Sequence, residues 1–151
     1  MVVEAGSTAP AFDLMTGAGQ RLSLAALKGR RVVLYFYPKD DTSGCTKEAI
    51  AFNALKAEFA AAGTVIVGVS ADDVASHDKF KAKHDLSLTL AADPDKSAIE
   101  AYGVWVEKSM YGKTYMGTER STFVIGPDGK IKAILRKVKP AEHVVQVLAA
   151  L

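Results

Sequence analysis

Residues 31–63 constrain the fold more than any other part of the chain, because they combine an apolar run, a polar loop and an amphipathic stretch. Residues 32–37 are all β-branched, aliphatic or aromatic, which is typical of a strand buried on both faces. Pro38 ends this run, and the residues after it are rich in turn and helix-capping types. Apolar residues then recur at helical spacing, so the sequence predicts a helix over residues 45–62.

The single cysteine of the chain, Cys45, falls in the first turn of this predicted helix. At about 100° per residue it shares one arc with Ala49, Phe52 and Phe59, so its sulfur is expected at the edge of the buried face. The unpaired N–H groups and partial positive charge of a helix N-terminus favour a thiolate, which is the reactive form of cysteine. A lone cysteine can also be a small buried hydrophobe, but the polar loop before Cys45 favours a reactive residue.

Residues 35–49 read Tyr-Phe-Tyr-Pro-Lys-Asp-Asp-Thr-Ser-Gly-Cys-Thr-Lys-Glu-Ala. This segment resembles the active site of peroxiredoxins, specifically of the bacterioferritin comigratory protein or peroxiredoxin Q subfamily. The core of that motif is Pro, three residues, Thr, two residues, Cys, and the chain matches it at Pro38, Thr42 and Cys45. The resemblance covers nearly the whole chain and continues downstream at Trp105, residues 111–117 and residues 119–125.

Two positions depart from the family pattern. Ser43 stands where relatives usually have proline, and a serine there can cap the helix instead. Many relatives carry a resolving cysteine five residues after the first, where this chain has Ile50, and others place one on the next helix, where this chain has none. An ideal helix places Ile50 about 140° around and about 7.5 Å along the axis from Cys45. With one cysteine no intramolecular disulfide can form, so the chain is expected to be of the 1-Cys type.

The resemblance implies a thiol-dependent peroxidase that reduces hydrogen peroxide and alkyl hydroperoxides. In that chemistry a sulfur anion displaces one oxygen of the O–O bond, and fixed donors near the leaving oxygen lower the barrier. Cys45 is the expected nucleophile, Thr42 a hydroxyl donor to the thiolate or the peroxide, and Arg120 the permanent cation. Gly44 is expected to let the peroxide approach backbone N–H groups, and Pro38 to shield the sulfur from water. Both are therefore expected substrate-binding residues.

Other interpretations of these residues exist. By position alone Arg120 would be a solvated charge at a strand edge and Thr42 a turn or helix cap, so both assignments depend on the resemblance. Asp40 and Asp41 would oppose a thiolate and are expected to lie in solvent. A dithiol oxidoreductase needs Cys-x-x-Cys, and the last position of that motif is a glutamate here. A non-catalytic redox sensor or binding module that uses Cys45 as a switch is the remaining alternative.

The order of predicted elements is that of an α/β, thioredoxin-like fold in a single domain over residues 1–151. It consists of a central mixed β-sheet flanked by helices, with an N-terminal β-hairpin turning at residues 16–19. Residues 31–70 form a parallel strand, helix, strand unit. The expected remainder consists of a surface helix over residues 72–84, a short strand and a short helix, a loop over residues 105–117, a hairpin turning at residues 126–129 and a helix from Pro140.

Composition excludes several functional classes. A chain of 151 residues suits one domain with a sizeable core, and a net charge of +2 with scattered lysines is not a nucleic-acid footprint. No apolar stretch reaches the length of a membrane span, and the first residues lack the pattern of a signal peptide. One cysteine supplies no disulfide framework, so a cytoplasmic location is expected. His77, His84 and His143 are expected on surface helices without metal-ligand spacing, so neither a metal nor a cofactor is expected.

The expected partners are small molecules and a reducing protein or peptide. A lone sulfenic acid must be reduced by an external thiol, and the resemblance implies thioredoxin, glutaredoxin or glutathione. It also implies a chain that works as a monomer or as a weak homodimer. For four further residues the sequence leaves two roles open. They form either an apolar rim for an organic hydroperoxide or part of the ordinary core packing: Trp105, Tyr111, Tyr115 and Met116.

Overall fold

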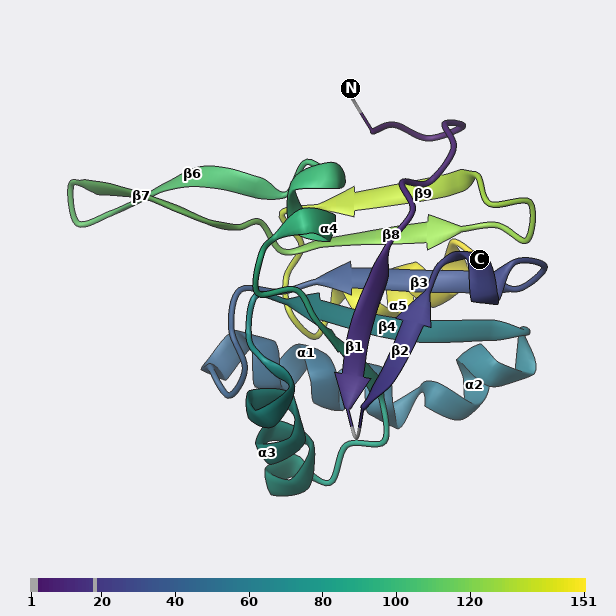
Figure 1. The fold of residues 1–151 in the computed structure, drawn as a ribbon, viewed down its shortest axis with the longest axis horizontal. Helices are drawn as coiled ribbons and strands as arrows, with labels where there is room; N and C mark the ends of the chain where they lie inside the picture. The colour runs from purple at the N-terminus through teal and green to yellow at the C-terminus, as the bar shows by residue number, and fades with distance from the viewer. Residues whose placement is uncertain (1–2, 18) are drawn as a thin grey trace.

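The centre of the computed structural model is a seven-stranded mixed sheet (Figure 1). The structure describes residues 3–17 and 19–151. The strands of this sheet are β1 (Asp13–Gly17), β2 (Gln20–Ser23), β3 (Arg31–Phe36), β4 (Thr64–Ser70), β5 (Thr89–Ala92), β8 (Ser121–Ile125) and β9 (Ile131–Arg136). They follow the order β2-β1-β5-β4-β3-β8-β9. Strands β3, β4 and β5 are parallel, whereas β8 is antiparallel to β3 and β1 is antiparallel to β5.

Helices and the N-terminal segment bury the two faces of the sheet. The helices are η1 (Ala25–Leu27), α1 (Ser43–Ala54), α2 (Lys56–Ala61), α3 (Val74–His84), α4 (Ser97–Ala101) and α5 (His143–Ala149). One hydrophobic cluster joins side chains of α1, α2, α3 and α5 to one face. The other joins the N-terminal segment, η1 and α4 to the opposite face. The predicted mixed sheet flanked by helices, with its N-terminal hairpin of β1 and β2, is therefore confirmed.

Strand β3 lies inside the sheet between β4 and β8 and is buried on both faces, as the apolar run predicts. Side chains alternate between the two clusters along the strand, because successive residues of a strand point to opposite faces. Val33, Tyr35 and Tyr37 join the cluster under α1. Val32, Leu34 and Phe36 join the opposite cluster.

Three predicted elements differ from the observed ones. The helix expected over residues 45–62 is two helices that meet at Leu55, where φ and ψ are −100° and 11°. No glycine or proline marks this break, and the apolar spacing continues across it. The final helix begins at His143 rather than at Pro140, after a turn over residues 140–142. The first error is a break inside a predicted element, which a continuous apolar spacing does not reveal, and the second concerns the start of an element, which periodicity defines poorly.

The third difference is larger, because residues 105–117 are not a loop. They form most of a separate hairpin of β6 (Trp105–Met110) and β7 (Lys113–Thr118) that projects from the body of the protein (Figure 1). Tyr111 and Gly112 have φ values of 52° and 77°, as a two-residue hairpin turn requires. Side chains here do not alternate between apolar and polar because most of the hairpin, beyond its base at Trp105, projects away from the core. The strand pattern was therefore absent from the sequence.

Replacing Gly68 by alanine is expected to destabilise the sheet. A Cβ at this position would lie 2.6 Å from Tyr35 Cζ, 2.7 Å from its hydroxyl and 2.8 Å from Leu90 Cδ2. Overpacking of this kind costs about 2 kcal/mol of the free energy of unfolding, measurable by urea denaturation. Gly117→Ala is the matched control, since its Cβ would meet the flexible Lys108 side chain at 3.2 Å. Equal stability of the two variants would contradict this packing account.

Candidate active site

Cys45 lies in the first turn of α1, as predicted, and only 2% of its surface is exposed. Thr42 is the N-cap, so the N–H groups of Ser43, Gly44 and Cys45 precede the first helical hydrogen bond, which Thr46 N–H donates to the Thr42 carbonyl at 2.8 Å. Free donors at this end of a helix stabilise negative charge on the sulfur. The residue is packed but is not enclosed by hydrocarbon alone, because a cation reaches it.

That cation is Arg120, which lies just before β8. Its Nη2 donates to Cys45 Sγ at 3.4 Å, and its Nη1 donates to Glu48 Oε1 at 2.6 Å. One guanidinium therefore joins the sulfur to a carboxyl group one helical turn further along α1. Burial lowers the pKa of Arg120, but the negative charges of Glu48 and Cys45 outweigh this and raise it overall. Arg120 is thus a permanent positive charge next to the sulfur.

Gly44 makes this approach possible. A Cβ on Gly44 would lie 3.0 Å from Arg120 Nη2 and 3.2 Å from Pro140 Cγ. A larger residue would therefore push the guanidinium away from the sulfur. The sequence assigned Gly44 to the approach of the peroxide, whereas the structure shows a glycine that admits the arginine. Its contact with peroxide stays a prediction.

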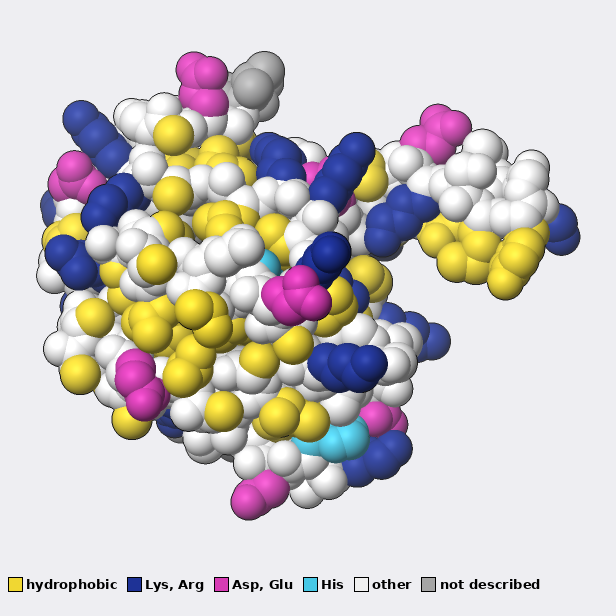
Figure 2. Space-filling view, turned by 180° about the vertical axis from the view of Figure 1, so that it is seen from behind, with side chains coloured by type: hydrophobic (Ala, Val, Ile, Leu, Met, Phe, Trp, Pro, Cys, Tyr) yellow, Lys and Arg dark blue, Asp and Glu magenta, His cyan; other side chains and the backbone are white. Residues whose placement is uncertain are grey.

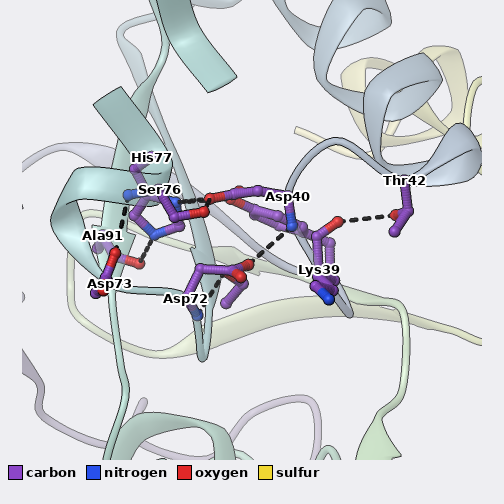
Figure 3. A network of polar contacts seen from close by, with 10 residues as sticks. Lys39, Asp40, Thr42, Asp72, Asp73, Ser76, His77 and Ala91 are labelled. Atoms are coloured by element: carbon purple, nitrogen blue, oxygen red, sulfur yellow. Dashed lines mark hydrogen bonds and ion pairs between the residues drawn. The ribbon is translucent and has the colours of Figure 1, made fainter. Parts of the chain in front are cut away.

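Thr42 and Pro38 also lie in the loop before α1. The Thr42 hydroxyl donates to the Lys39 carbonyl at 2.8 Å, so in this structure its proton is directed into the loop (Figure 3). No side-chain capping bond is present at this helix start, and the expected cap by Ser43 is wrong because Ser43 is already helical. Pro38 is half-buried and lies two residues after the end of β3. The roles of Thr42 towards the thiolate and of Pro38 as a shield stay predictions.

Asp40 is buried, which contradicts its expected place in solvent. Its carboxylate accepts hydrogen bonds from the Tyr37 hydroxyl at 2.6 Å and the Ser76 hydroxyl at 2.8 Å, and lies 2.7 Å from His77 Nδ1 (Figure 3). Burial alone would raise the pKa of Asp40, but these hydrogen bonds, led by that from His77, lower it below its ordinary value. The active-site loop is therefore fastened to α3. Asp41 is half-exposed and pairs with Lys83 and His84.

His77 completes this network and is not a surface residue. Its Nε2 lies 3.0 Å from the Ala91 carbonyl and its Nδ1 lies 2.7 Å from the Asp40 carboxylate, so each ring nitrogen lies opposite a hydrogen-bond acceptor. The backbone N–H of Asp40 adds a bond to Asp72 Oδ2 at 2.8 Å. The residue types alone did not reveal these contacts, because the partners are far apart in the sequence.

Asp40→Asn is expected to loosen the loop that carries the site. The amide cannot accept all the bonds of the carboxylate and removes the negative charge that faces the His77 ring, which costs about 3 kcal/mol of the free energy of unfolding. Asp41→Asn is the control at the adjacent, solvent-exposed position and should change stability far less. Chemical denaturation measures both variants. If both variants lose the same small amount of unfolding free energy, the buried network does not fasten the loop.

Sequence reasoning missed Glu48 and misplaced His143. Glu48 is fully buried beneath Arg120, and His143 is buried on α5 with its Nε2 3.0 Å from the Thr122 hydroxyl and 3.4 Å from Glu48 Oε2. The spacing of three residues from Cys45 was the available signal for Glu48, since residues i and i+3 share a helix face. Within residues 3–17 and 19–151, no group of three or more potential metal ligands is present.

The projecting hairpin exposes apolar side chains (Figure 2). Tyr111 is 97% exposed, and Tyr115 and Met116 are about half-exposed, so core packing is excluded for these three. Trp105 is half-buried and packs against the core. Burial, and then the charge of Arg120, lower the pKa of Lys108 on β6, while Cys45 opposes this shift. The base of the hairpin therefore lies within electrostatic reach of the site.

The site combines a buried cysteine at the start of a helix with an arginine that lies just before a strand of a mixed sheet. This combination defines the class of cysteine-dependent peroxidases with a thioredoxin-like fold. The AhpC/TSA family model matches residues 5–134, and the chain belongs to this family. It is 48% identical over 151 residues to a putative peroxiredoxin Bcp of Coxiella burnetii, covering 100% of both chains. It is 44% identical to peroxiredoxin Bcp of Bacillus subtilis, covering 100% of this chain and 96% of the relative.

Solved structures agree. The bacterioferritin comigratory protein of Xanthomonas campestris, studied for its alkyl peroxide reduction activity, superposes with a TM-score of 0.91 at 45% identity, covering 99% of this chain and 94% of that one. A peroxiredoxin Q variant from Xylella fastidiosa gives 0.93 at 37% identity, covering 99% and 95%. The predicted subfamily and thioredoxin-like fold are confirmed, and the chain is a thiol-dependent peroxidase of the 1-Cys type. No helix in the described part of the chain is long and apolar enough to cross a membrane.

Proposed function

We propose that Cys45 reduces hydroperoxides as the attacking nucleophile and that Arg120 activates it. The observation that carries this assignment is the 3.4 Å contact between Arg120 Nη2 and the sulfur at the start of α1. A thiolate there attacks one peroxide oxygen, so that an S–O bond forms as the O–O bond breaks. Sulfur is oxidised to a sulfenic acid, and the departing alkoxide or hydroxide takes a proton from water.

The residues around the sulfur supply the other interactions of the reaction. Free N–H groups of Gly44 and Cys45 can donate to the peroxide oxygens, where negative charge develops as the O–O bond breaks. Thr42 can turn its hydroxyl from the loop carbonyl to the peroxide, and the ring of Pro38 limits access of water. Hydrogen peroxide and alkyl hydroperoxides are the proposed substrates. The alkyl peroxide reduction activity studied in the Xanthomonas relative supports the second.

The sulfenic acid of this chain has to be resolved by a second molecule. Cys45 is the only cysteine, and Ile50, where many relatives carry the resolving residue, points outward with 47% of its surface exposed. An external thiol condenses with the sulfenic acid to a mixed disulfide and water, and another thiol then releases Cys45 and carries away the disulfide. We propose thioredoxin, glutaredoxin or glutathione as the reductant, a reducing cytoplasm as the compartment, and a monomer or weak homodimer as the working form.

Mass spectrometry of the intact chain tests this cycle. One equivalent of hydroperoxide should add one oxygen to the mass, and the correct thiol should then give a mixed disulfide before the starting mass returns. Each candidate reductant is added in turn, with the Cys45→Ser variant as the control that forms neither adduct. A chain that is oxidised but is returned by none of these thiols, even in excess, would support the redox sensor instead.

A further inference from the structure

Glu48 carries a buried oxygen that the proposed mechanism leaves unused. The side chain has no exposed surface, and Oε1 accepts the 2.6 Å hydrogen bond from Arg120. Oε2 makes no hydrogen bond within the described residues, although it lies 3.4 Å from His143 Nε2. A buried carboxylate oxygen without a partner is costly. The surroundings of Oε2 therefore indicate a proton between Glu48 and His143, which either a neutral carboxyl group or a charged imidazole would supply.

The hydrogen bonds of His143 define which of its nitrogens can take part. Nδ1 lies 2.8 Å from the Lys139 carbonyl, which can only accept, so Nδ1 carries a proton. In a neutral ring Nε2 is then an acceptor, with the Thr122 hydroxyl as donor at 3.0 Å. Without a further proton, the lone pairs of Nε2 and of Glu48 Oε2 would face each other at 3.4 Å. One proton between them removes this repulsion.

We propose that Glu48 and His143 hold one proton in common, and that this proton keeps the charge of Arg120 available to the Cys45 sulfur. With the proton present the pair is neutral in total, whether the proton resides on Oε2 or on Nε2. Oε1 still accepts from Arg120, so the guanidinium stays in place while its charge is directed to the thiolate. When the proton leaves, the pair becomes an anion that competes for Arg120 and repels the sulfur.

The other groups that face Glu48 are consistent with this arrangement. Tyr35 on β3 stays neutral, because burial and then the negative charge of Glu48 raise its pKa well above the ordinary value. Cys45 shares the helix of Glu48, and Arg120 is the cation facing the carboxyl group. Burial raises the pKa of Glu48 to about 8 against the opposing effect of Arg120, and burial lowers the pKa of His143. Both shifts favour the proton on the carboxyl group near neutral pH.

The test is the pH dependence of the reaction of Cys45 with hydrogen peroxide, and it rests on the proposed function. In the wild type the second-order rate constant should fall about tenfold between about pH 7 and pH 9.5, as the shared proton is lost. Glu48→Gln keeps an acceptor for Arg120 but cannot ionise, so its rate constant should change less than about twofold over that range. Thiolate absorbance is recorded in parallel, so that the ionisation of Cys45 can be separated from the fall of the rate constant. Glu119→Gln, which neutralises a nearby carboxylate bound to Ser121 and Arg136, should keep the wild-type profile.

The outcomes distinguish this inference from the proposed function. A wild type that reacts with peroxide no faster than an ordinary thiol at any pH contradicts the peroxidase site itself. If the wild type is reactive but the fall of its rate constant at alkaline pH persists in the Glu48→Gln variant, only the shared proton is contradicted. Infrared spectra of the wild type with isotope-labelled glutamate give an independent measurement if the variant does not fold. One band of a protonated glutamate should be present at neutral pH and should disappear over the pH range in which the rate constant falls. The proposal is overturned if this band is absent at neutral pH and nitrogen NMR shows that the His143 ring shares no proton with Glu48.

Discussion

Replacing Cys45 by serine is expected to abolish hydroperoxide reduction, with a loss of at least about 10³-fold in the rate constant. A serine hydroxyl is not ionised at neutral pH and cannot be oxidised to a sulfenic acid, so no part of the cycle remains. The fold should survive, because serine differs from cysteine by one atom and the surrounding cluster of α1 and α5 is otherwise unchanged. Peroxide consumption in a coupled assay measures the loss, and circular dichroism verifies the fold.

A matched control separates the thiol from its position. Ile50→Cys in the Cys45→Ser background carries one cysteine on the same helix, at a site that is 47% exposed. This thiol should react with peroxide at the rate of an ordinary cysteine. If it reacts as fast as Cys45 does in the wild type, the start of α1 confers no special reactivity and the site assignment is wrong.

Arg120→Lys is expected to reduce the rate constant by about 10² or more while the protein stays folded. Lysine keeps the positive charge but carries a single point donor, whereas the guanidinium bonds the sulfur and Glu48 at the same time. One of these two contacts must therefore be lost. Stopped-flow kinetics with hydrogen peroxide measure the rate, and thermal denaturation measures the stability of the same sample.

Arg136→Lys is the control for this substitution. Arg136 makes the same type of contact with a carboxylate, at 3.4 Å to Glu119, but its guanidinium does not bond the sulfur. Its variant should retain the wild-type rate. An Arg120→Lys variant with an unchanged rate would assign that arginine to structure alone. A collapse of stability with no rate effect at low temperature would lead to the same conclusion.

Much of the scaffold could be predicted from the sequence because it depends on local patterns. The apolar run at residues 32–37 is long enough to predict a strand buried on both faces, and the turn-forming residue types before Cys45 predict the start of a helix, although no side chain there makes a capping bond. The hairpin of β6 and β7 could not be predicted in this way, since most of its side chains face no core and show no alternation. The two-residue turn at Tyr111 and Gly112 was its only local signal.

The buried polar residues were the other failure, and their cause is physical. Asp40, His77 and His143 are residue types that normally face water, so composition and periodicity place them on the surface. They are buried because partners from distant segments satisfy their hydrogen bonds, as Ala91 does for His77 and Thr122 does for His143. Such pairings depend on the assembled sheet, which a local pattern does not contain.

The central claim is that the fold makes the Cys45 sulfur a fast nucleophile towards peroxide. The most direct measurement compares the rate constant for oxidation of Cys45 by hydrogen peroxide in the folded chain and in the same chain unfolded in urea, at one pH. The site geometry predicts a folded chain that reacts at least about 10³-fold faster, because helix donors and Arg120 act only when the fold is present. A difference of less than about tenfold would contradict it.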